Sequence, residues 1–70
     1  HGETLARAVQ PGEFVIVDGE PREVDSVTPV RTWYVTIDFA SFDREPDGSP
    51  SAYLSRTFEA NGVFVLTDGW

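Results

Sequence analysis

The chain contains no cysteine, no lysine and no methionine, and its one histidine is the first residue. Without cysteine there can be no disulfide and no thiolate zinc site, so the fold must be held together by packing alone or by packing plus self-association. Without cysteine, lysine or an internal histidine, the serines have no neighbour of the kind that activates a hydroxyl nucleophile. Paired carboxylates are the one remaining route to acid–base chemistry, and a chain of 70 residues is too small for a deep substrate cleft. The sequence therefore predicts a protein that is not an enzyme and has no cofactor.

Positive charge is also scarce, since 5 arginines are set against 12 acidic residues and the net charge is −7. Such a balance repels phosphate backbones and anionic lipids, so nucleic acid and membranes are unfavourable partners. No stretch approaches the ~20 apolar residues of a membrane-spanning helix, and no signal-peptide pattern is visible. We expect a cytoplasmic protein by default. The exclusive use of arginine indicates a high-GC coding background, such as that of actinobacteria and their phages.

Two runs of four consecutive apolar residues, 14–17 and 63–66, are the most informative feature that the chain does contain. A strand points alternate side chains to opposite faces, so each run is apolar on both of its faces. A domain of this size has a single core, which takes only one face of each strand. The other face must be covered by the N-terminal segment from Leu5 to Val9, by a second copy, or by a partner.

Turn residues divide the rest of the chain into about five predicted strands, which fit a small antiparallel barrel. These predicted strands span residues 13–17, 22–27, 31–40, 52–59 and 63–67. In the third, Trp33, Val35, Ile37 and Phe39 are spaced two apart and are predicted to face the core. We therefore predict an all-β fold, a single small SH3-like barrel over residues 13–70, preceded by a tag remnant and an N-terminal arm over residues 1–12.

Three local patterns refine this prediction. The spacing of Val24 and Val27 breaks the alternation, which indicates a β-bulge or a sharp bend near residues 25–26. The second strand is expected to end at Pro29, because proline cannot donate to a ladder. Residues 60–62, Ala-Asn-Gly, have the composition of a tight hairpin turn.

Residues 13–24, Glu-Phe-Val-Ile-Val-Asp-Gly-Glu-Pro-Arg-Glu-Val, resemble the opening hairpin of KOW-like and SH3-like barrels. The family of bacterial elongation factor P and its archaeal and eukaryotic relatives begins with a similar strand, turn and strand. The resemblance implies an SH3-like fold. That family presents a modifiable lysine on a glycine-rich loop after the second strand, whereas this chain has Thr-Pro-Val-Arg at residues 28–31 and no lysine at all. The function of the family therefore does not carry over.

In an SH3-like arrangement the first and last strands pair, which sets the two apolar runs side by side. Their outward side chains then form one contiguous apolar patch, and such patches on small proteins usually mark a contact surface. We predict that this patch consists of Val15, Val17, Phe64 and Leu66, or else of the alternate residues, which have the opposite phase.

Side chains outside the predicted core face are a second set of candidates. Tyrosine, tryptophan and arginine are enriched at binding hot spots. The predicted binding residues are Tyr34, Tyr53, Arg56 and Trp70. The alternative is that the tyrosines take part in ordinary cross-strand pairing, which stabilises a sheet without any further role.

An acidic segment, Asp43-x-Glu45-x-Asp47-Gly48, resembles the first half of a calcium-binding loop. Pro46 stiffens this segment, and Leu54 stands at the twelfth position, where a bidentate glutamate is needed. The sequence therefore predicts a solvated acidic turn and no metal site.

These features together predict a non-catalytic protein-interaction or assembly module that works through an apolar strand surface. The expected contact is a protein partner or a second copy in a homodimer. The alternative is a small barrel that binds or mimics nucleic acid. Binding would need several of the 5 arginines to gather on one face.

Overall fold

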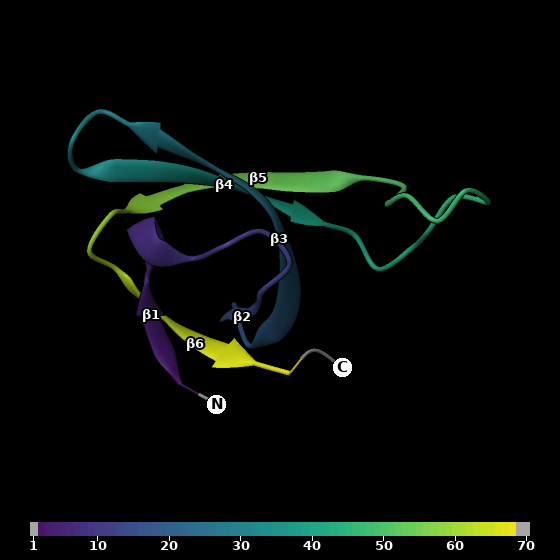
Figure 1. Ribbon diagram of the computed structural model, residues 1–70, viewed down its shortest axis with the longest axis horizontal. Helices are drawn as coiled ribbons and strands as arrows, with labels where there is room; N and C mark the ends of the chain where they lie inside the picture. Colours follow the sequence, from purple (N-terminus) through teal and green to yellow (C-terminus); the bar gives the residue numbers. More distant parts are fainter. Residues whose placement is uncertain (1, 69–70) are drawn as a thin grey trace.

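The computed structural model describes residues 2–68, which form one antiparallel sheet of six strands and a single turn of 3-10 helix (Figure 1). The elements are β1 (Glu3–Leu5), η1 (Ala6–Ala8), β2 (Phe14–Val17), β3 (Glu20–Val30), β4 (Tyr34–Ala40), β5 (Tyr53–Glu59) and β6 (Val63–Thr67). Their order across the sheet is β1-β6-β2-β3-β4-β5. The all-β prediction is confirmed. Within residues 2–68, β1 and β5 are the two edges and do not pair with each other, so the sheet is not closed into a barrel.

The long strand β3 connects the two halves of this sheet. Its first residues, 20–23, pair with β2, and most of the strand pairs with β4, with a register shift between Val24 and Ser26. Asp25 is therefore the extra residue of a β-bulge, as the sequence predicted. A bulge bends a strand and increases its twist. In Figure 1, β3 curves from the layer of β4 and β5 to the layer of β1 and β6, so the two halves face each other across the core.

Deleting Asp25 tests whether this bend is required. The deletion leaves the alternation of β3 intact, because Val24 still points inward and Ser26 outward, but a regular strand does not bend as a bulged one does. We expect the unfolding free energy to fall by about 2–3 kcal/mol, measured by urea denaturation followed by circular dichroism. Asp25→Ala, which keeps the bulge at this exposed position, should change stability by less than about 0.5 kcal/mol. Equal stability of the two variants would contradict the role of the bulge.

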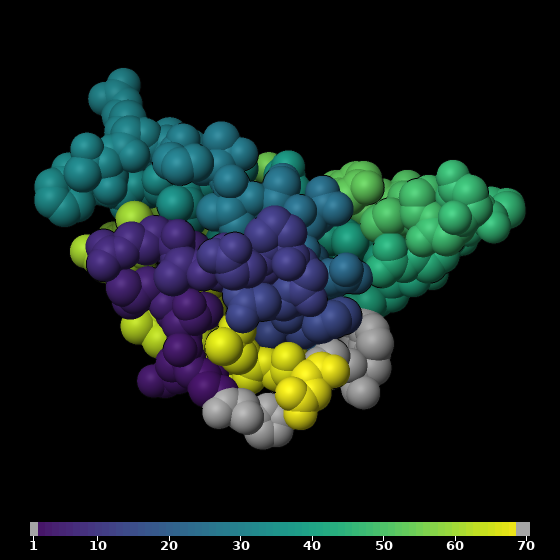
Figure 2. Space-filling view, in the orientation of Figure 1, coloured from purple at the N-terminus to yellow at the C-terminus, as the bar shows by residue number. Residues whose placement is uncertain are grey.

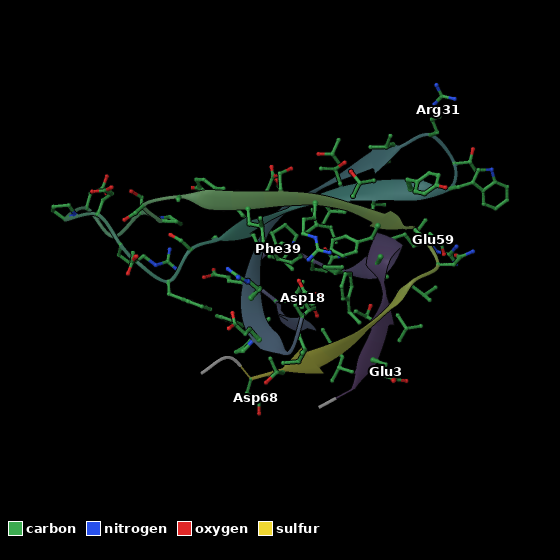
Figure 3. All side chains as sticks on the ribbon, turned by 180° about the vertical axis from the view of Figure 1, so that it is seen from behind. Glu3, Asp18, Arg31, Phe39, Glu59 and Asp68 are labelled. Carbon is green, nitrogen blue, oxygen red and sulfur yellow. The ribbon has the colours of Figure 1, made fainter. Side chains whose placement is uncertain are left out.

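The core lies between the two layers and is built mainly from alternate residues of β2, β3 and β4. Its largest fully buried side chains are Phe39, Ile37, Val15 and Val24. Phe39 lies in the interior, between the two halves of the sheet (Figure 3). Phe58 makes edge-to-face contacts with Phe39 and Phe64, with ring centroids 6.1 and 4.9 Å apart, and so joins the two layers. The predicted inward positions of β4 are confirmed for Val35, Ile37 and Phe39.

Trp33 does not lie on the core face, and this prediction is wrong. The side chain is 67% exposed. The chain reverses direction over residues 31–33, and Arg31 has a positive φ of 58°, so β4 begins only at Tyr34. Trp33 therefore belongs to the loop between β3 and β4, where the alternation of the strand no longer decides which way a side chain points.

Two predicted strand ends also differ from the structure. β3 continues through Pro29 to Val30, because residues 26–30 pair with β4 on one side only, and a proline is tolerated where a strand has a single neighbour. The turn at residues 60–62 forms, but β5 and β6 do not pair with each other. The Ala60 N–H donates to the carbonyl oxygen of Trp33, and the Gly62 carbonyl accepts from Ala6, both at 2.7 Å. This turn is therefore a corner between the two layers and not a hairpin.

The N-terminal segment forms part of the sheet and of the core. β1 pairs with β6, and Ala6 and Val9 are buried among the core residues. The segment therefore widens the sheet at its edge and closes one end of the core. No helix within residues 2–68 has the length and apolar character needed to cross a membrane.

Candidate functional site

The two apolar runs lie on adjacent strands, as predicted. β2 and β6 pair through Phe14 with Thr67 and Val15 with Leu66. Of the four residues predicted to form the outward patch, Val15, Val17 and Phe64 are buried in the core, and Leu66 packs against the core from its edge. The structure therefore selects the opposite phase for the outward surface, because β3, β4 and β5 cover the other face of these two strands.

The outward residues of this opposite phase form a continuous row over β1, β6 and β2. Directly paired residues share a face, so Leu5 lies beside Val63 on the outer side of the sheet. The members of this surface, here termed the outer apolar face, are Leu5, Phe14, Ile16, Val63 and Val65. Val63 and Val65 are 61% and 48% exposed, and the other three are half-buried. β6 is an interior strand of the sheet, so these valines are not exposed merely because they stand at an edge.

Carboxylates border the outer apolar face. Glu3 pairs with Val65 and is exposed, and Glu23 pairs with Phe14. The Glu23 carboxylate accepts a hydrogen bond from Arg44 at 2.8 Å, which neutralises it, whereas no ion pair from a residue in the described range reaches Glu3. The face is therefore apolar at its centre and acidic at one rim, a composition suited to contact with protein and unsuited to anionic surfaces.

The predicted binding residues are not brought together. Tyr34 and Tyr53 share the outer face of the β4–β5 pair, 46% and 55% exposed, but they lie opposite Glu59 and Ala40 at the two ends of that pair. Arg56 lies on the other face, opposite Ile37, where it donates to Asp18 at 2.7 Å and stacks over Phe58. Trp70 lies outside the described residues. Between the tyrosines, Thr36 and Thr57 form a 2.8 Å hydrogen bond, which is ordinary cross-strand pairing.

The acidic segment of residues 43–48 forms a tight turn. The carboxylate of Asp47 accepts hydrogen bonds from the backbone N–H and the hydroxyl of Ser49, at 3.0 and 2.6 Å. These two bonds stabilise the charged form and lower the pKa of Asp47 below its usual value. Within residues 2–68, acidic and histidine side chains do not form a group able to hold a metal ion.

Three of the arginines are matched by carboxylates. Arg44 and Arg56 pair with Glu23 and Asp18, and Arg22 pairs with Glu20 at 3.5 Å while also lying 5.8 Å from the ring centre of Phe42. These guanidinium groups are exposed to water at least in part, so each pair contributes little to stability. The pairing nevertheless removes these three arginines from any common basic surface.

Sequence reasoning left the phase of the apolar runs open and missed the loop between β3 and β4. Val30, Trp33 and Tyr34, at or beside this loop, are each more than a third exposed. The apolar alternation in the sequence begins at Trp33, one residue before β4 begins at Tyr34. The pattern therefore gave no sign that Trp33 belongs to the loop. Comparisons of the chain with protein-family models, with curated proteins and with solved structures find no match.

Proposed function

We propose that this chain is a non-catalytic protein-interaction module that docks through its outer apolar face. The single observation that carries the proposal is the exposure of Val63 and Val65 on an interior strand of the sheet, with no other part of the described chain packed over them. Apolar side chains aligned on neighbouring strands lose unfavourable contact with water when a second protein surface covers them. The rim glutamate Glu3 favours a partner with polar or basic residues at the matching position.

An SH3-like architecture is part of the same proposal. It is supported by the strongly bent antiparallel sheet and by the pairing of β2 with β6, the first and last strands of the predicted barrel. The hairpin of β2 and β3 also forms over the residues that resemble the opening of such barrels. Nucleic-acid binding has less support, because three of the five arginines are engaged with carboxylates of the chain itself.

The simplest occupant of the outer apolar face is a second copy of the chain. A standard interface buries roughly 800 Å² on each partner. That is about a sixth of the 4568 Å² accessible surface of one chain, so a dimer interface would extend beyond the five apolar residues onto polar neighbours. We therefore expect a weak dimer, with a dissociation constant on the order of 10–100 μM.

Sedimentation equilibrium over a range of concentrations tests this proposal. The wild-type mass should rise from 7.8 kDa toward twice that value, and Val65→Asp should weaken association at least about tenfold, because it places a charge in the centre of the interface. Val30→Asp is the matched control, since Val30 is also exposed but lies at the end of β3, away from this face. A wild-type chain that stays monomeric up to about 1 mM, or equal effects of the two variants, would overturn the homodimer.

A further inference from the structure

A shallow groove of about 360 Å³ lies where the N-terminal segment meets the β3–β4 hairpin. Figure 2 shows this segment, in purple, packed directly against the hairpin, in teal. The floor of the groove is apolar and consists of Val9, Val27, Pro29, Val35 and Ala60. Its volume is at the low end of the range for ligand pockets, about 300–1,000 Å³, so it accommodates a few side chains.

The charge of this groove is opposite to that of the protein. The chain has 12 acidic residues and 5 arginines, yet among the described residues the lining includes Arg7 and Arg31 and not a single aspartate or glutamate. These are also the two arginines that form no ion pair with a carboxylate in residues 2–68. Two carboxylates lie beside the lining, because Glu13 accepts a hydrogen bond from the backbone N–H of Gln10 and Glu59 pairs with Tyr34. Any attraction of the groove for anions therefore depends on Arg7 and Arg31, whose field the apolar walls strengthen.

The two arginines differ in how they are held. Arg7 lines the groove, and its Nη1 donates to the side-chain oxygen of Asn61 at 2.6 Å, which holds the guanidinium on the side of the corner at residues 60–62. Arg31 stands on the outer lip, and its side chain extends from the tip of the hairpin into solvent (Figure 3). It has no hydrogen bond to another residue of the described chain, so folding over an occupant breaks no existing contact.

We propose that the groove binds a short extended segment of a protein partner, with one or two carboxylates at Arg7 and Arg31 and an apolar side chain on the floor. Guanidinium groups bind carboxylates through paired, charge-assisted hydrogen bonds. Trp33, 67% exposed, follows the groove residue Thr32 on the same hairpin, so an exposed aromatic side chain is available to the rest of the segment. A nucleic acid strand is a poorer occupant, because it would continue onto the surrounding acidic surface. This site is separate from the outer apolar face and does not depend on it.

The test is an NMR titration of the isotopically labelled chain with a peptide pool that carries two fixed glutamates separated by mixed proline and aliphatic residues. The acidic pool should shift the amide signals of Ala60 and Tyr34 and the indole signal of Trp33, with an affinity at least about tenfold above that of a pool with glutamine in place of glutamate. Binding should weaken as salt is raised. A single-stranded DNA oligonucleotide is titrated in parallel and should bind less tightly than the acidic pool.

The variant Arg31→Gly tests the role of Arg31 in binding without disturbing the fold. Glycine adopts the positive φ of this position without strain, so the variant should be at least as stable as the wild type and yet bind the acidic pool at least about tenfold more weakly. Arg44→Gln, which removes the same charge elsewhere, is the control and should keep the affinity within about twofold. Equal binding of the two pools, equal effects of the two variants, tighter binding of the DNA, or shifts confined to β1 and β6 would each overturn the proposal.

Discussion

Replacing Val15 with aspartate is expected to unfold the protein at neutral pH. Val15 has no exposed surface and lies on β2, between β6 and β3, with its side chain in the core. An ionised carboxylate placed there loses its hydration without gaining a partner, which costs several kcal/mol. A domain of this length has a total stability of about 4–10 kcal/mol, so the penalty is comparable to the whole. Far-UV circular dichroism at 25 °C should show loss of the strand signal.

Val65→Asp is the matched control for this prediction. It makes the same chemical change on the neighbouring strand, but Val65 is 48% exposed on the outer face. The introduced carboxylate stays hydrated, and we expect the variant to fold with a stability within about 1 kcal/mol of the wild type. The pair thus distinguishes the two possible phases of the apolar runs. If Val15→Asp stays folded while Val65→Asp unfolds, the assignment of inner and outer faces is wrong, and with it the proposed docking surface.

Replacing Phe39 with alanine is expected to have the second-largest effect. Phe39 is fully buried near the end of β4 and contacts Phe58 edge-to-face. Truncation removes the ring and leaves a cavity that the rigid strands around it fill only in part, a change that typically costs about 3–5 kcal/mol. We expect the midpoint of urea denaturation to fall sharply. Circular dichroism is the suitable probe, because Trp33 is already largely exposed in the folded state.

Tyr53→Ala serves as the comparison for Phe39→Ala. It removes an aromatic ring from the adjacent strand β5, at a position that is 55% exposed. No cavity forms, and the loss is limited to cross-strand contact, so we expect less than about 1 kcal/mol. Similar losses for the two variants would show that Phe39 does not occupy the centre of the core. A small effect of Phe39→Ala alone would mean that the surrounding strands collapse to fill the space.

The proposed partners of the two surfaces are compatible with each other. The outer apolar face lies over β1, β6 and β2, whereas the groove is lined by residues of β3, β4, the loop between them, η1 and the segment after it, and the corner at Ala60. No residue lines both surfaces. A dimer formed through the first therefore does not require any residue that lines the second. The two sets of variants report on them independently, because Val65→Asp and Arg31→Gly change different parts of the sheet.

Local patterns in the sequence sufficed to predict five of the six strands and several of their details, whereas β1 lies in the segment that was expected to be an arm. Alternation in residues 35–39 specified one buried face of β4, since side chains two apart on a strand share a face. The broken spacing of Val24 and Val27 located the bulge, because an extra residue returns both side chains to the core. The lack of cysteine excludes disulfides and thiolate metal sites through composition alone, whatever fold the chain adopts.

The tertiary structure alone decided which face of the apolar runs is buried and where the chain leaves a strand. Both phases of residues 14–17 and 63–66 are equally apolar, so only the bend of β3 over them selects the inner one. Trp33 continues the alternation of β4, yet the reversal at Arg31 places it in a loop. Arg7 and Arg31 are 24 positions apart in the chain, and no local pattern shows that they border one groove. Each of these outcomes depends on contacts between segments that are far apart in the sequence. A local pattern of apolar and polar residues does not show which distant segments will meet.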